Sequence, residues 1–122
     1  MMRLWIGSTA AMALSTCAAS AAPPPLRIGD EATIPYASSD GILDWKIASA
    51  DTLYVRSMMN RWYLVRTQGP CPRLRSAGRV GFVTVGSDRL DRYGAIVAEG
   101  WRCQIASITL SAPPPPEVAR KG

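Results

Sequence analysis

Cysteines, aspartates and arginines are the residues of this 122-residue chain whose types could support chemistry. No histidine occurs in the sequence, which removes the base of Ser-His-Asp and Cys-His catalysis and the commonest transition-metal ligand. The sequence also contains no C-x-x-C pair, no P-loop and no G-x-G-x-x-G turn. We therefore expect no catalytic residues, no cofactor, no metal site and no enzymatic activity.

Two of the cysteines, Cys71 and Cys103, are predicted to form a disulfide bond. The third, Cys17, lies in an N-terminal segment with the features of an export signal, so processing leaves an even number of thiols. A catalytic thiol would need a base such as histidine, and a zinc site would need about four clustered ligands. A structural disulfide is the remaining interpretation.

Two pairs of aspartates are close enough in the sequence to be considered for carboxylate catalysis: Asp40 with Asp44, and Asp88 with Asp91. Glycosidase chemistry needs two carboxyl groups about 5–10 Å apart across a sugar-sized cleft. Asp40 and Asp44 flank a predicted turn, where aspartate commonly bonds its own backbone. Asp88 and Asp91 alternate with two arginines, which favours local ion pairs. We predict structural roles for both pairs.

A cationic stretch without any acidic residue runs from Thr52 to Ser87. It holds a possible anion-binding patch made of Arg56, Arg61, Arg66, Arg73, Arg75 and Arg79. Such a patch would attract an unknown protein, a glycan or an anionic envelope surface. The alternative is that these arginines are solvated outward positions on strands, whose stems cover apolar surface. Neighbouring aromatic residues could also stack on bases, but export argues against a nucleic-acid partner.

The N-terminal residues 1–21 are predicted to be a signal peptide. Arg3 supplies the positive charge, residues 4–14 the apolar run, and residues 19–21 an A-x-A cleavage site. Release after Ala21 would give a periplasmic or secreted protein. Alternatively, residues 14–17 resemble a lipoprotein box apart from a threonine before the cysteine, and acylation at Cys17 would anchor the protein to a membrane.

The rest of the chain is predicted to be one β domain, residues 32–110, between a Pro-rich leader, 22–31, and a disordered Pro-rich tail, 111–122. Alternating apolar and polar residues, rich in β-branched and aromatic types, predict short strands. They cover residues 32–36, 43–47, 52–56, 61–67, 79–85, 93–98 and 101–110. The expected fold is mostly β: a small antiparallel meander, barrel or sandwich of six to seven short strands with one disulfide.

Within these strands the alternation also predicts faces: Leu43, Trp45 and Ile47 share one face of their strand. Residues 71–77 could hold a single helical turn.

An ordered set of short motifs spans about residues 34–110. The motifs are Gly41-Ile42-Leu43-Asp44-Trp45, Leu53-Tyr54-Val55, Arg61-Trp62-Tyr63-Leu64, Gly69-Pro70-Cys71, Leu90-Asp91-Arg92-Tyr93 and Arg102-Cys103-Gln104-Ile105. This set resembles a family of small exported or lipoprotein-like proteins of Gram-negative bacteria whose function is unknown. The resemblance supports the domain boundaries and the cysteine pairing, and it implies no activity.

Taken together, the sequence predicts an exported cell-envelope protein that acts as a non-catalytic binding or structural module. The alternative is a periplasmic inhibitor or accessory subunit of an enzyme or transporter. That alternative would use a rigid loop held by the disulfide, at about residues 69–75.

Overall fold

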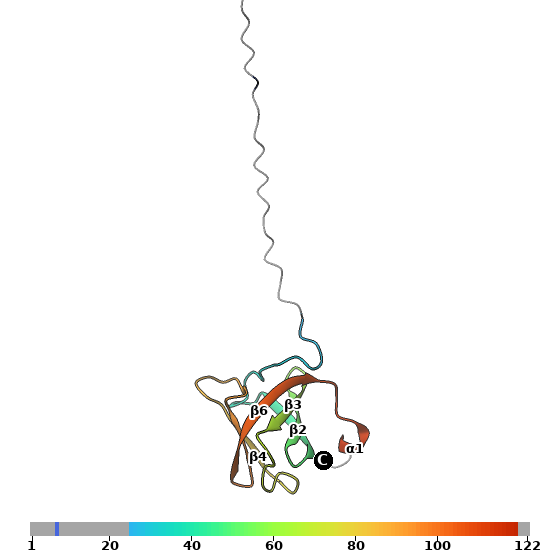
Figure 1. Ribbon diagram of the computed structural model, residues 1–122, viewed down its shortest axis with the longest axis vertical. Helices are drawn as coiled ribbons and strands as arrows, with labels where there is room; N and C mark the ends of the chain where they lie inside the picture. Colours follow the sequence, from blue (N-terminus) through green and yellow to red (C-terminus); the bar gives the residue numbers. More distant parts are fainter. Residues whose placement is uncertain (1–6, 8–24, 120–122) are drawn as a thin grey trace, which may run out of the picture.

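The computed structural model describes Gly7 and residues 25–119 of the chain (Figure 1). Its body is one six-stranded antiparallel sheet curled into a half-barrel. The strands are β1 (Ile42–Ser49), β2 (Thr52–Ser57), β3 (Trp62–Thr67), β4 (Val80–Val83), β5 (Ala95–Ala98) and β6 (Trp101–Ser111). A four-residue helix, α1 (Pro116–Ala119), follows the last strand. The predicted mostly β, antiparallel fold is confirmed.

The strand order β1-β2-β3-β6-β5-β4 divides the sheet into two three-stranded meanders that join where β3 pairs with β6. As a result, β1 and β4 are the free edges of the sheet. The chain passes from β3 to β4 through residues 68–79, which we call the crossing segment. This segment passes the turn between β1 and β2, where the N–H of Cys71 donates to the carbonyl of Ala50 at 2.8 Å.

The core lies on the concave face of the sheet, and side chains from loops outside the sheet complete it. Three loop segments each insert one large, fully buried side chain: Ile34, Leu74 and Leu90 are all 0% exposed. Leu74 belongs to the crossing segment, which the predicted disulfide between Cys71 and Cys103 ties to β6 across a Cα–Cα distance of 5.7 Å. The cysteine pairing expected from the sequence is thus confirmed.

The strand expected at residues 32–36 is wrong. In its place the structure has isolated bridges, from Glu31 to Thr109 and from Ile34 to Leu90. Pro35 cannot donate to a ladder, and the backbone reverses at Tyr36 with a positive φ of 56°. Similarly, residues 71–77 form successive turns, not a helix.

The prediction that Leu43 shares a strand face with Trp45 and Ile47 is also wrong. A bulge between Ile42 and Asp44 inserts one extra residue opposite β2. The side chain of Leu43 is therefore 51% exposed, and Ile42 packs against the core in its place.

A second irregularity shifts the apolar face of β6. The register between β3 and β6 changes between Arg66 and Thr67. Ile105 and Ile108 are consequently both buried, although their spacing of three would put them on opposite faces of a regular strand.

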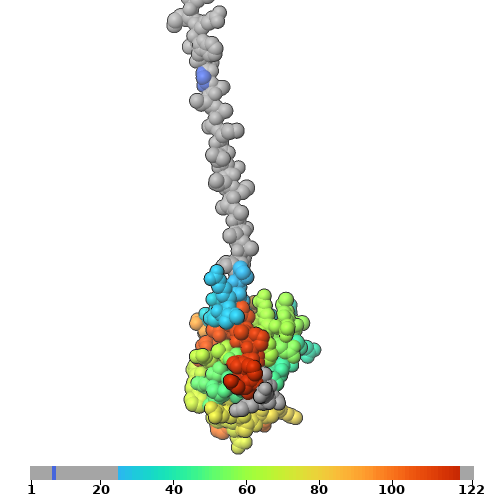
Figure 2. All heavy atoms as spheres, turned by 90° about the vertical axis from the view of Figure 1, so that its right-hand side faces the viewer, coloured from blue at the N-terminus to red at the C-terminus, as the bar shows by residue number. Residues whose placement is uncertain are grey.

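At the ends of the chain, the predicted signal peptide and Cys17 lie outside the described residues. Ser111 still belongs to β6, and α1 contacts β1. Figure 2 shows this C-terminal segment in red, lying against the body of the domain. No helix in the described part of the chain is long and apolar enough to cross a membrane.

Candidate functional site

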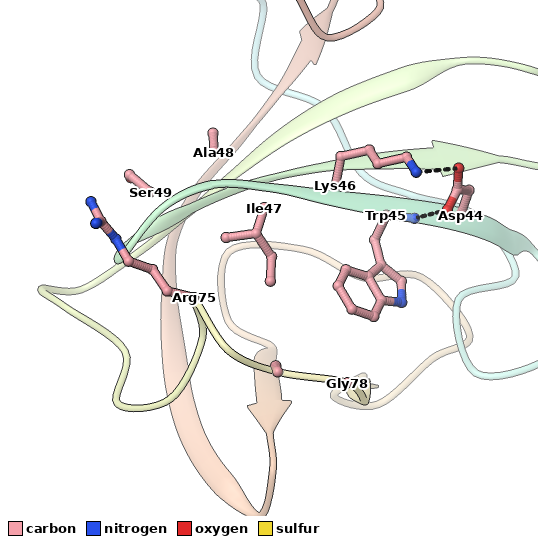
Figure 3. A pocket seen from close by; sticks show the side chains of 9 residues that line it. Asp44, Trp45, Lys46, Ile47, Ala48, Ser49, Arg75 and Gly78 are labelled. Atoms are coloured by element: carbon pink, nitrogen blue, oxygen red, sulfur yellow. Dashed lines mark hydrogen bonds and ion pairs between the residues drawn. The ribbon is translucent and has the colours of Figure 1, made fainter. Parts of the chain in front are cut away.

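A groove of about 720 Å³ follows the free edge of β1 (Figure 3). One wall is β1 itself, from Asp44 to Ser49, and the other is the crossing segment at Arg75, Ala77 and Gly78. A smaller hollow of about 290 Å³ shares Asp44 and Trp45 with the groove and continues between β1 and the other edge strand, β4. We call the two together the seam. Its lining comes from β1 between Ile42 and Ser49, from Ala37 and Ser39 before β1, from Arg75, Ala77 and Gly78 of the crossing segment, and from Val80 and Phe82 of β4.

The floor of the seam is apolar. Trp45 and Ile47 point from β1 toward the crossing segment, whereas Lys46 and Ala48 point to the other side of the sheet (Figure 3). On the opposite edge, Val80 and Phe82 are half-buried and, like Trp45 and Ile47, pack against the core. The mouth of the half-barrel therefore leaves apolar side chains in partial contact with solvent.

The hydrogen-bond alternation of β2 determines which backbone groups of β1 face the seam. The N–H of Ser57 donates to the carbonyl of Arg61 at 2.8 Å, on the β3 side. In an antiparallel strand, the backbone groups of successive residues point alternately to the two neighbouring strands. The backbone groups of Arg56, which precedes Ser57, therefore bond toward β1. Asp44 is the β1 residue opposite Arg56, so it bonds toward β2.

Trp45 and Ile47, which alternate with the residues bonded to β2, therefore direct their backbone groups into the seam. The N–H of Trp45 donates to Oδ1 of Asp44 at 2.8 Å, which confirms its outward direction. The other carboxylate oxygen of Asp44 lies 3.9 Å from the ammonium of Lys46. The N–H of Ile47 and the carbonyl oxygens of both residues face the groove.

The same alternation applies to β4. The N–H of Glu99 donates to the carbonyl of Arg79 at 3.4 Å, which places this pair among the bonds that join β4 to β5. Gly81, opposite Val97, therefore bonds toward β5. Val80 and Phe82 therefore direct their backbone groups into the seam. Among residues 25–119, neither β1 nor β4 has a second partner strand, and both edges border the seam.

The six predicted anion-binding arginines do not form one patch. Arg73, Arg75 and Arg79 belong to the crossing segment beside the seam. Arg56 and Arg66 extend from the convex face of β2 and β3, because they alternate with buried residues. Arg61 lies at the turn between these two strands. Within the described residues none of the six makes an ion pair within 4.0 Å of a carboxylate.

The aspartates considered for catalysis make contacts typical of turns. Asp88 accepts hydrogen bonds from the backbone and hydroxyl of Ser38 and from the hydroxyl of Ser39, and these bonds hold the pKa of its carboxyl below the usual 3.8. Asp91 accepts the N–H of Tyr93 at 2.9 Å. Asp40 is exposed, and Asp44 is engaged at the edge of β1 as described above.

Asp51 has a comparable role in the turn between β1 and β2. Hydrogen bonds from the hydroxyls of Ser49 and Thr52 lower the pKa of its carboxyl.

The ion pairs expected within residues 88–92 are absent from the described part of the chain. Arg92 pairs instead with Glu31 at 3.6 Å, because the nearby carboxylates are occupied by hydroxyl and backbone donors. Within residues 25–119, no three cysteine or carboxylate side chains lie close enough together to hold a metal ion.

Fold and site together define a small disulfide-bonded half-barrel, with a seam between its two edge strands that has an apolar floor and polar walls. The chain belongs to the Family of unknown function (DUF6491), whose model matches residues 1–113. Comparison with the curated proteins and with the solved structures gave no match. The disulfide is typical of proteins that fold in an oxidising compartment outside the cytoplasm.

Proposed function

We propose that this protein is exported to the cell envelope and acts there as a non-catalytic binding module, with the seam as its binding surface. The observation that carries the proposal is the pair of half-buried apolar side chains, Trp45 and Phe82, beside backbone groups of two unpaired strand edges. Ligand sites are typically concave and mostly apolar, with a few polar groups that fix orientation. The groove volume falls in the usual range for such sites.

Export is supported by two independent features. The N-terminal residues have the charge, apolar run and small-residue site of a signal peptide, and the disulfide fits an oxidising compartment. Mass spectrometry of the mature protein separates the two routes: release after Ala21 gives an unmodified N-terminus, and lipidation gives an acylated Cys17.

A binding role without catalysis is supported by the composition of the site. The seam contains one aspartate, Asp44, and its carboxylate already binds the N–H of Trp45 and the side chain of Lys46. The remaining polar side chains of the seam are Ser39, Ser49 and Arg75, without a histidine or cysteine to form a nucleophile–base pair.

Site-specific photo-crosslinking in cells tests the proposal. A photoreactive phenylalanine analogue replaces Ile47 in the seam, and the same analogue replaces Trp101, an exposed residue of β6, as the matched control. We expect one adduct of defined mass from position 47 and none from position 101. The adduct should disappear when Phe82→Asp places a charge in the seam. Equal labelling from both positions, or no adduct from position 47, would contradict the proposal.

The second candidate is an inhibitor or accessory subunit that uses the crossing segment as a rigid loop. The disulfide fixes Cys71, and the backbone on either side of it takes positive φ values at Gly69 (80°) and Arg73 (65°). Arg73 and Arg75 are exposed on this loop. Replacing both with alanine would abolish partner binding under this candidate, but would leave an apolar contact at Ile47 largely intact.

A further inference from the structure

We propose that the seam accepts one extended peptide segment of another protein as a seventh strand, which pairs with β1 on one side and β4 on the other and closes the half-barrel. This inference rests on the proposed function and names the ligand class of the same site. Strand addition of this kind draws its affinity from main-chain hydrogen bonds and its specificity from alternate side chains.

The backbone of the seam is arranged for such a strand. Trp45 and Ile47 on β1, and Val80 and Phe82 on β4, are the residues whose N–H and C=O groups point away from their paired neighbours. An extended chain directs successive backbone groups to opposite sides. A single inserted strand therefore has donors and acceptors for both edges at once. On β1 it would pair with the N–H of Ile47 and the carbonyl oxygens of Trp45 and Ile47, because the N–H of Trp45 is bound by Asp44.

The side chains of the same four residues determine what the inserted strand presents inward. All four are half-buried and pack against the core, and Ala77 adds to this apolar surface from the crossing segment. Because side chains alternate between the two faces of a strand, every second residue of the ligand faces this apolar floor. We infer that these residues are aliphatic, and that the alternate ones face solvent.

Charge around the seam favours an acidic ligand. Arg75 lines the groove, and Arg73 and Arg79 lie on the same crossing segment, without an ion pair to a described carboxylate. Two acids beside the seam already have partners: Asp44 binds Lys46 and the N–H of Trp45, and Glu99 accepts the N–H groups of Gly78 and Arg79 at 2.7 and 3.1 Å. Arg79 comes just before Val80 and alternates with the inward-facing Val80 and Phe82, so it lies on the solvent side of β4. Solvent-facing carboxylates on the inserted strand would meet its guanidinium group.

A second copy of this chain fits the seam less well. Pairing between two β1 edges would leave β4 without a partner strand, whereas one inserted strand can reach both edges.

Fluorescence anisotropy of labelled synthetic peptides, about six residues long, with the processed full-length protein tests the inference. The probe alternates valine and glutamate. A valine–lysine peptide is the charge control, and a serine–glutamate peptide is the apolar control. We expect the valine–glutamate peptide to bind at least about tenfold more tightly than either control. Equal binding of the lysine peptide would overturn the acidic assignment.

Peptides methylated on backbone nitrogens distinguish strand insertion from binding by side chains alone. Alternate amides of an inserted strand face opposite edges, so methylation of either alternate set should weaken binding by about tenfold or more. Loss from only one set would mean that a single edge is used, and would overturn closure of the barrel. No loss from either set would overturn strand addition and leave the seam as a binding surface. If no peptide binds and position 47 gives no adduct, the proposed function itself fails.

Protein variants give an independent readout at the β1 edge. Ile47→Pro removes the N–H that faces the seam, a position where an edge strand tolerates proline. Ile47→Ala is the matched control, which loses the side chain and keeps the donor. We expect the proline variant to bind the peptide about tenfold more weakly than the alanine variant, and equal affinities would contradict the inference. The methylated peptides need no variant and test the same point if Ile47→Pro fails to fold.

Sedimentation of the protein without peptide tests the competing occupant. We expect a monomer, and a dimer that dissociates on addition of the valine–glutamate peptide would assign the seam to a second copy.

Discussion

The hydroxyl of Ser57 lies on the concave side of β2, where the residue is 1% exposed, and no described group hydrogen-bonds to it. A buried polar atom without a partner loses the hydrogen bonds that it made to water in the unfolded chain. Ser57 is thus a polar residue in a position that packing alone would give to an apolar one.

We expect Ser57→Ala to raise the free energy of unfolding by about 1 kcal/mol, because it removes the unpaired hydroxyl and leaves only a small void. Urea denaturation of the wild type and the variant measures the change. Ser107→Ala, at a half-buried position on β6, is the control and should stay within about 0.5 kcal/mol. A clear loss of stability in Ser57→Ala would mean that the hydroxyl has a partner in solution.

Single residues were predictable where their chemistry left one choice. Two cysteines in an oxidising compartment can pair in only one way, and the pair of Cys71 with Cys103 is present. The six arginines are different, because their distribution depends on which strands are neighbours and on the path of the crossing segment. Counting charges along the sequence gives no information on the strand neighbours or on the path of this segment.

Strands were predicted from the alternation of apolar and polar side chains. These predictions failed where the backbone departs from regular alternation. Strands β2 and β3 alternate regularly between buried and half-buried or exposed residues, and both were found close to their predicted ranges. The bulge at Leu43 and the register change opposite Ile105 each insert an extra residue. A bulge moves all following side chains to the other face, and no residue type marks these two positions in the sequence.

Gly94, just before β5, allows the close approach of β4 and the loop that carries Leu90. A Cβ added at Gly94 would contact the carbonyl oxygen of Val83 and the side chain of Leu90 well inside van der Waals distance. We expect Gly94→Ala to lower the free energy of unfolding by about 1–3 kcal/mol, the usual range for overpacking. Thermal unfolding followed by circular dichroism measures the effect.

Gly81→Ala is the matched control for this effect, because its added Cβ would make only an ordinary contact with Val97, at 3.8 Å. That variant should be neutral or slightly stabilised, since alanine is less flexible than glycine in the unfolded chain. Equal destabilisation of both variants would contradict the assignment of the effect to the close contacts at Gly94.

At the scale of the whole molecule, the fold class followed from the number and spacing of strands, and the seam did not. The seam exists because β3 pairs with β6, which leaves β1 and β4 at the edges. Such long-range pairing depends on the three-dimensional fit of apolar faces and on the loops that fill the concave side. Trp45 and Phe82 can be recognised from the sequence as apolar strand residues. The sequence does not indicate that they line the same seam.

The disulfide should supply a large part of the stability of this domain. Its cysteines are 32 residues apart, and loop-closure entropy gives a stabilisation of about 3–4 kcal/mol for this separation. We expect the double variant Cys71→Ala, Cys103→Ala to lose about that amount in urea denaturation. Reducing agent should reproduce the loss in the wild type and have no effect on the double variant. A loss below about 1 kcal/mol would indicate that the crossing segment is held by Leu74 alone.

The position of β6 at the end of the domain has a consequence for incomplete chains. This strand supplies the second neighbour of β3, the second neighbour of β5 and the thiol that binds Cys71. A premature stop codon before Trp101 would therefore release two unfinished half-sheets, each with an additional bare flank, together with a reactive sulfhydryl. Such nonsense products should be efficient substrates for proteolytic quality control.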